Sequence, residues 1–77
     1  MNAVILYRTD RTKNMHRFYR LDVQRDLFGA WCLMREWGRI GQGGGQTRME
    51  SYATSADAQT ALEKQSRAKE RRGYYFA

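Results

Sequence analysis

Proline is absent from this chain of 77 residues, and cysteine and histidine each occur once. A single cysteine cannot form an intramolecular disulfide, so we expect no disulfide-stabilised secreted domain, and a reducing compartment is the simpler assumption. Cys32 lies in an apolar run, where a free cysteine is typically a small buried residue. Cys32 and His16 are too few for a four-ligand zinc site and give little support to a Cys-His nucleophile pair.

Long apolar runs are also missing. No segment approaches the roughly 18 apolar residues of a membrane-spanning helix, and Ala3 to Leu6 is too short for the core of a signal peptide. We therefore expect no membrane partner and a cytoplasmic location, with association with the nucleoid as an alternative. The 8 acidic residues are spread among basic neighbours, which suits surface ion pairs better than catalysis by paired carboxylates. We expect no enzymatic activity, no cofactor, no metal site and no small-molecule substrate.

Arginine is what the chain has in excess. The 14 basic residues comprise 11 Arg and 3 Lys, the acids number 8, and the formal net charge is +6. Guanidinium groups bind phosphate with paired donors and stack on bases, whereas lysine acts as a point charge. This bias favours a polyanion partner, most commonly nucleic acid, over a basic surface that serves only solubility.

Apolar and polar residues that alternate at period two predict strands. A Thr-x-x-Asp capping box at Thr54, followed by an alanine-rich stripe, predicts one helix that ends near Arg72 with Gly73 as its cap. Residues 74–76 are aromatic and are expected to dock or pair at a sheet edge. The predicted class is α+β: a single domain over residues 1–77, with an antiparallel sheet of four to five strands and one helix packed on one face. The expected strands are Ala3–Thr9, His16–Arg25, Ala30–Trp37 and Gln46–Tyr52.

Two connections carry glycine signals. Asp26 to Gly29 has the composition of a hairpin turn in which Gly29 takes a positive φ. Residues 41–45, Gly-Gln-Gly-Gly-Gly, predict a flexible hairpin connection. They lack both the Gly-Lys-Ser/Thr of a phosphate-binding loop and the Gly-x-Gly-x-x-Gly spacing of a dinucleotide site, and a strand rather than a helix follows. We therefore favour a plain connection over a nucleotide-binding loop.

The candidate site is the segment from Arg35 to Gly41, which combines a large aromatic residue, a glycine and arginines next to the glycine-rich loop. Such a set can stack on a base or sugar while a guanidinium group binds a phosphate. A hairpin of the third and fourth expected strands would bring Arg48 back close to Arg39. Two alternatives stay open: Trp37 is part of the core, or the basic end of the helix is only a solvated face.

The tripeptide Trp37-Gly38-Arg39, extended as Trp-Gly-Arg-Ile-Gly, preceded by Arg35 and followed by a glycine-containing loop, resembles the signature of the WGR domain. The resemblance covers nearly the whole chain, and order, spacing and length agree. Beyond the signature it rests on Asn14, Arg17-Phe18-Tyr19, Leu21, Gly45, Arg48, Asp57-Ala58, Lys69 and Tyr74.

WGR domains are known from DNA-damage-dependent poly(ADP-ribose) polymerases, where they bind DNA near a strand break and relay that binding to a separate catalytic domain. Similar small stand-alone domains occur in bacteria. The resemblance implies a non-catalytic module of the DNA damage response that binds DNA ends, nicks or junctions through sugar-phosphate contacts. It further implies that Trp37 packs against the sugar-phosphate at a DNA end, that Arg39 makes backbone or interdomain contacts, and that Arg48 supports phosphate binding. The candidate nucleic-acid-binding residues are Arg35, Trp37, Gly38, Arg39, Arg48 and Lys69.

Two other partners stay open from the residues alone. Single-stranded RNA would use the same aromatic and arginine side chains. A protein-interaction module would instead dock a partner through its aromatic and glycine-rich edge, with the basic charge steering the encounter.

Overall fold

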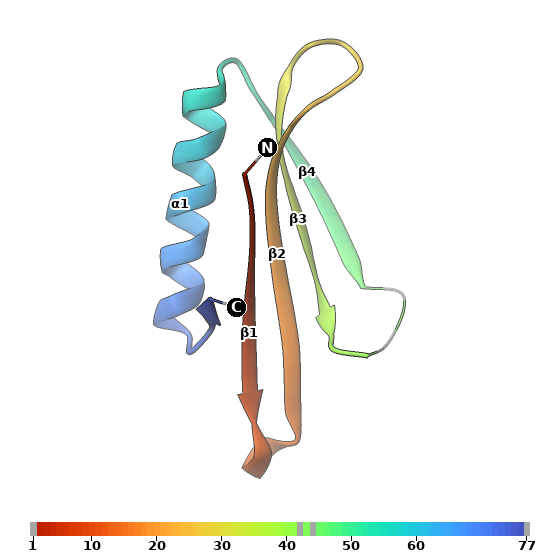
Figure 1. Ribbon diagram of the computed structural model, residues 1–77, viewed down its shortest axis with the longest axis vertical. Coiled ribbons are helices and arrows are strands. Elements are labelled where there is room, and N and C mark those ends of the chain that lie inside the picture. The colour runs from red at the N-terminus through yellow and green to blue at the C-terminus, as the bar shows by residue number, and fades with distance from the viewer. Residues whose placement is uncertain (1, 42, 44, 77) are drawn as a thin grey trace.

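The computed structural model describes residues 2–41, 43 and 45–76. The expected flexible loop at 41–45 therefore falls partly outside the described residues. Five strands, a short 3-10 turn and one α-helix follow one another along the chain (Figure 1). They are β1 (Asn2–Asp10), η1 (Arg11–Lys13), β2 (Met15–Arg25), β3 (Trp31–Arg39), β4 (Gln46–Tyr52), α1 (Ser55–Arg71) and β5 (Tyr75–Phe76).

The strands form one antiparallel sheet in the order β4-β3-β2-β1-β5. In Figure 1, α1 runs alongside the sheet, which it contacts through β2, β3 and β4. The helix packs on the face that holds the buried apolar side chains. The predicted α+β class, with four to five strands and one helix on one face, is confirmed.

Period-two alternation decides which side chains enter the core. In the cross-strand row Leu6, Tyr19 and Trp37, the side chains point toward α1, and their chain neighbours point to the opposite, open face. Leu6 and two further leucines, Leu21 and Leu33, are completely buried. Burial of an aliphatic side chain contributes about 1.5–3 kcal/mol. The core cluster comprises Leu6, Tyr19, Leu21, Val23, Leu33, Ala58 and Leu62.

The β2–β3 hairpin turn is built by Asp26. Its carboxylate accepts hydrogen bonds from the backbone N–H groups of Phe28 at 2.8 Å and Ala30 at 2.9 Å. Gly29 has φ +82°, which L side chains rarely adopt. The predicted hairpin turn is therefore confirmed, and local signals alone explain it.

The boundaries of α1 are also those expected from its capping residues. The Thr54 hydroxyl oxygen accepts the backbone N–H of Asp57 at 3.1 Å, which satisfies one free donor of the first turn. Beyond the last turn, Gly73 has φ +95° and ends the helix as predicted. The chain then pairs Tyr75 and Phe76 with β1, so of the expected docking or pairing at a sheet edge the structure shows pairing.

Three details differ from the sequence-based expectation. The expected third strand, Ala30–Trp37, is observed as Trp31–Arg39, so Trp37 lies two residues inside the strand and not at its end. The β3–β4 register places Arg48 opposite Arg35, not close to Arg39. The buried stripe of α1 includes Ser66. Its hydroxyl group donates a hydrogen bond to the Leu62 carbonyl at 2.9 Å, so the donor is satisfied within the helix without water.

Candidate nucleic-acid interface

The helix-covered face of the sheet is hollow near the C-terminal end of α1. A cavity of about 440 Å³ opens there, and all four long strands and the end of the helix contribute to its wall. Every charged side chain that lines it is a cation. Its lining residues are Arg8, Arg17, Arg35, Arg48, Lys69 and Arg72, together with the aromatic residues Tyr19, Trp37 and Tyr74.

Strand register places the four strand arginines of the cavity wall in two like-charge pairs, and Arg17 also lies opposite Arg39, which is outside the wall. Arg8 lies directly opposite Arg17 across β1 and β2, and Arg35 lies directly opposite Arg48 across β3 and β4. Like charges at directly opposite positions destabilise a sheet. The two pairs sit on the same face, so the sheet carries an electrostatic cost at this one place. An anionic ligand in the cavity would relieve it.

Aromatic rings fill the space between the two arginine pairs. The rings of Tyr19 and Trp37 are stacked, with centroids 5.6 Å apart and an interplanar angle of 11°. Tyr74 meets Tyr19 edge-on, with a centroid distance of 6.2 Å. The Lys69 ammonium lies 4.4 Å from the Tyr19 ring centroid, within cation–π range. Cations and π-faces therefore share one wall, which is the combination that binds sugar, base and phosphate together.

Few acids neutralise this wall. Arg35 forms an ion pair with the Glu50 carboxylate, with 3.0 Å between Nη2 and Oε1, while the buried Nε of Arg35 has no hydrogen-bond partner among the described residues. Burial lowers the pKa of Lys69, and the positive charges of Arg72 and Arg35 lower it further. The protonated lysine is thus held where its charge is disfavoured, and a bound phosphate would reverse that effect.

Lys69→Met is expected to stabilise the free protein at neutral pH, because it removes a charge that burial and the positive charges of Arg72 and Arg35 disfavour. The lowered pKa means that the unfolded chain binds the Lys69 proton more tightly than the folded chain does. Stability of the wild type therefore rises as pH increases from the lowered pKa toward the ordinary lysine value. Thermal unfolding from pH 7 to 10 should show a gap between the two proteins that narrows with pH. A lower melting temperature for the variant at pH 7 contradicts this account.

The cavity gathers some of the residues that the sequence selected and leaves others outside. Arg35, Trp37, Arg48 and Lys69 line it. Arg39 does not: its Nη2 donates to the Asn14 carbonyl at 3.2 Å and ties the end of β3 to the β1–β2 turn. The role of each in binding nucleic acid stays a prediction.

Gly38 lies beside the cavity and has a packing reason to be glycine. A Cβ atom at Gly38 would lie 3.1 Å from the Gly45 Cα and 3.3 Å from the Phe18 ring. At Gly45 the approach is closer, since a Cβ atom would lie 2.7 Å from the Trp37 carbonyl oxygen. The two glycines let the backbones of β3 and the loop meet next to Trp37. Both positions therefore favour glycine because the backbones approach closely here.

Five lining residues were not selected as binding residues from the sequence. The three that lie in strands were within reach of the period-two pattern, because Arg17 shares a face with Tyr19 and Arg8 shares a face with Leu6. The strand registers, which the sequence did not specify, were needed to bring the strand residues to one cavity. These residues are Arg8, Arg17, Tyr19, Arg72 and Tyr74.

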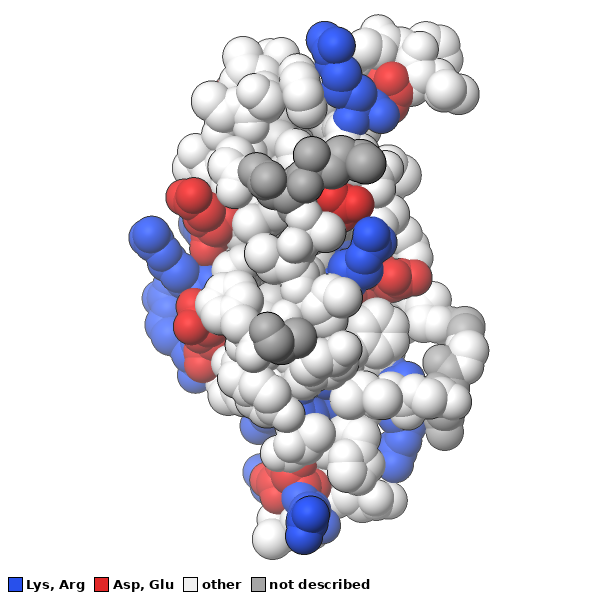
Figure 2. Space-filling view, in the orientation of Figure 1, with Lys and Arg blue, Asp and Glu red and all other residues white. Residues whose placement is uncertain are grey.

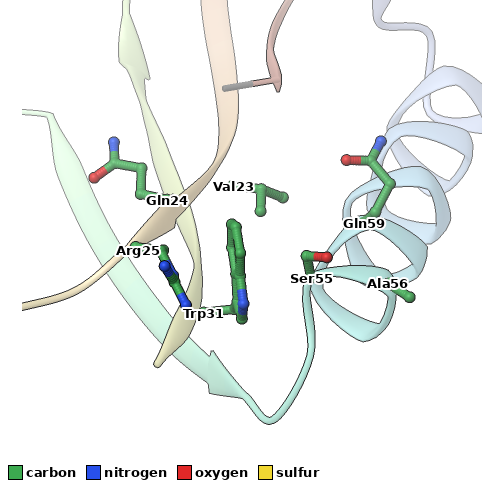
Figure 3. Close-up of a pocket in the computed structure, with 7 residues that line it drawn as sticks. All are labelled: Val23, Gln24, Arg25, Trp31, Ser55, Ala56 and Gln59. Atoms are coloured by element: carbon green, nitrogen blue, oxygen red, sulfur yellow. The ribbon is translucent and has the colours of Figure 1, made fainter. Parts of the chain in front are cut away.

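A second, larger hollow of about 720 Å³ has a different character. It lies beside the first turn of α1, where Trp31 stands between Arg25 on one side and Ser55 on the other (Figure 3). Its single charged lining residue, Arg25, is 5.0 Å from the Trp31 ring centroid. Charge is also mixed along the outer side of α1, where Figure 2 shows acids and bases interspersed. The concentration of cations without acids belongs to the smaller cavity.

An antiparallel sheet with a hollow of cations and stacked aromatic rings defines the class of this chain: a small α+β binding domain for a polyanion. The chain belongs to the WGR family, since the family model described as WGR domain matches residues 2–76. WGR domains are in general nucleic-acid-binding modules, so the predicted family and the coarse function are both confirmed.

One curated relative comes from Sinorhizobium fredii (strain NBRC 101917 / NGR234) and is described as "Uncharacterized protein y4dW". It is 39% identical over 67 residues, a match that covers 87% of this chain and 32% of the relative. The chain thus spans about a third of the length of that protein. Within the described residues, no helix has the length and apolar character needed to cross a membrane.

Proposed function

We propose that this domain binds DNA at ends, nicks or junctions through sugar-phosphate contacts and catalyses no reaction itself. The proposal rests on the two pairs of directly opposed arginines in the cavity wall, which lie around the stacked rings of Tyr19 and Trp37. Arginine binds phosphate with paired, charge-assisted hydrogen bonds. Such contacts position a protein on the backbone but carry no sequence information, so we expect weak sequence preference.

The shape of the cavity favours an interrupted backbone over a continuous duplex. About 440 Å³ is in the range of small-molecule sites, so the cavity has room for a single nucleotide unit. A DNA end, nick or junction exposes a sugar face that can pack on an aromatic ring. In an intact duplex the same sugars are flanked on both sides by their neighbours. A protein with this ligand would act where strand breaks arise in a chromosome, which in a bacterial cell is the cytoplasm.

The test is a binding titration on linear, nicked and covalently closed circular DNA of the same sequence. We expect the linear and nicked forms to bind more tightly, and log affinity to fall with log salt at a slope of about −3.6 if four phosphates are neutralised. Equal affinity for all three forms would reduce the site to a general phosphate binder. A slope near zero would overturn the electrostatic account. Competition with matched RNA, and capture of a protein partner after nuclease treatment, separate the two alternative partners.

A further inference from the structure

The outer edge of β4 is long and open. β4 is the last strand of the sheet, and no described residue pairs with its outer side. Five of its seven residues are exposed, and Met49 retains 55% of its accessible surface. The opposite edge is formed by β5, which has only two residues. Edge strands present unpaired backbone donors and acceptors, and proteins usually blunt them as β5 does here. β4 is therefore a template for another strand.

The sequence of β4 is complementary to itself in antiparallel orientation. When a second copy is aligned so that Met49 meets Met49, Arg48 faces Glu50 of the second copy and Glu50 faces its Arg48. Thr47 and Ser51 then face each other as a hydroxyl pair. Opposite charges and hydroxyl pairs are the cross-strand combinations that stabilise a sheet. A register shifted by one residue would lose the charge pairing.

An electrostatic deficit inside the monomer points to the same pairing. Arg48 lies opposite Arg35, and the nearby acid, Glu50, is paired with Arg35 at 3.0 Å. Arg48 itself makes no ion pair with any described residue. The Glu50 carboxylate of a second copy, placed across the β4 edge, would supply the missing partner. The added strand would thus satisfy open backbone groups and an unbalanced arginine together.

We propose that two copies of this chain pair through β4, antiparallel and centred on Met49, to form one continuous sheet. The two-fold axis then runs perpendicular to the sheet, because antiparallel extension of a sheet keeps the same faces on the same side. The helix and the cationic cavity of both copies therefore face one side. The interface consists of one strand from each copy, at the small end of specific interfaces. The dimer is accordingly concentration-dependent, and a nucleic acid long enough to reach both cavities strengthens it.

Thr47 and Ser51 offer a test that leaves the cavity intact. Both are exposed, and both point to the open face, away from Arg48 and Glu50. In the proposed dimer, position 47 of one copy faces position 51 of the other. The double variant Thr47→Lys/Ser51→Lys therefore places lysine opposite lysine at both contacts, and Thr47→Glu/Ser51→Glu places glutamate opposite glutamate. By sedimentation velocity on nuclease-treated protein, we expect each variant alone to stay monomeric at concentrations where the wild type dimerises. An equimolar mixture should recover the dimer.

Disulfide trapping tests the register. Directly opposite residues in an antiparallel pair have Cα atoms about 4.5–5.5 Å apart. This distance is within disulfide range for both hydrogen-bonded and non-hydrogen-bonded pairs. Met49→Cys is therefore expected to cross-link to itself under mild oxidation. Thr47→Cys is not, because the two copies of that position are offset by four residues, or about 13 Å along the strands. Cys32 is buried, so the unmodified chain serves as the background control.

Each outcome bears on the proposal. A wild type that stays monomeric up to millimolar concentration overturns it, as does a dimer that survives both charge variants or cross-links more readily through Thr47→Cys than through Met49→Cys. Because these measurements use protein free of nucleic acid, they do not depend on the proposed DNA function. Loss of DNA-end preference with the dimer intact would overturn only that function.

Discussion

Arg17→Gln/Arg72→Gln is expected to lower affinity for DNA ends by about a hundredfold. Hydrogen bonds to charged groups contribute about 1.5–3 kcal/mol, and about 1.4 kcal/mol corresponds to tenfold in affinity. Both side chains are exposed lining residues of the cavity, so the substitutions remove binding groups and leave the core alone. Since Arg17 faces Arg8, the change also removes a repulsion. We therefore expect the melting temperature to hold or rise while binding falls.

The matched control is Arg67→Gln/Arg71→Gln. It removes the same two positive charges, so both variants change the formal net charge from +6 to +4. Arg67 and Arg71 are exposed residues of α1 outside the cationic cavity. In the salt titration, the cavity variant should reduce the steepness of the slope by about 1.8 and the control by much less. Equal losses in affinity for the two variants would show that net charge, and not the cavity, governs binding.

The fold was predictable because its signals are local. The Thr54 cap, the positive φ at Gly29 and Gly73, and the alternation in β2 each depend on a few neighbouring residues. The end of β3 was not predictable in this way. Gly38 is a poor strand former, but Gly38 and Arg39 pair with Phe18 and Arg17 of β2, which holds them in the sheet. Tertiary pairing thus overrode local propensity.

The residues of the candidate site also fall into two groups, those that local signals identify and those that depend on strand pairing. The sequence signature located Trp37 and Arg35, which need only the alternation of one strand to share a face. Arg8 and Arg17 become part of the site only through the β1–β2 register, since a slip of one residue turns a side chain to the other face. The assignment of Arg48 to the vicinity of Arg39 was wrong for the same reason: the strand that returns is registered on Arg35. The sequence identified the types of residue that belong to the site, whereas strand register decides which of their side chains lie together in the cavity.

Trp37 belongs both to the core and to the wall of the cavity. It packs against the core cluster, stacks on Tyr19 at 5.6 Å and also lines the cationic hollow. Trp37→Ala is therefore expected to destabilise the domain by about 3 kcal/mol, as large-to-small changes of packed aromatic residues do. A loss of DNA binding in this variant would be ambiguous without a second tryptophan for comparison.

Trp31 provides that comparison. It packs against the same core cluster but lies by the other hollow, next to the first turn of α1 (Figure 3). Trp31→Ala should cost a similar amount of stability, measured by urea unfolding. At a temperature where both variants are folded, only Trp37→Ala should lose the preference for linear over closed circular DNA, and Trp37→Phe should retain part of it, because an aromatic face remains. If both alanine variants keep the preference, Trp37 acts only as a core residue, and the arginine pairs alone must account for the recognition of ends.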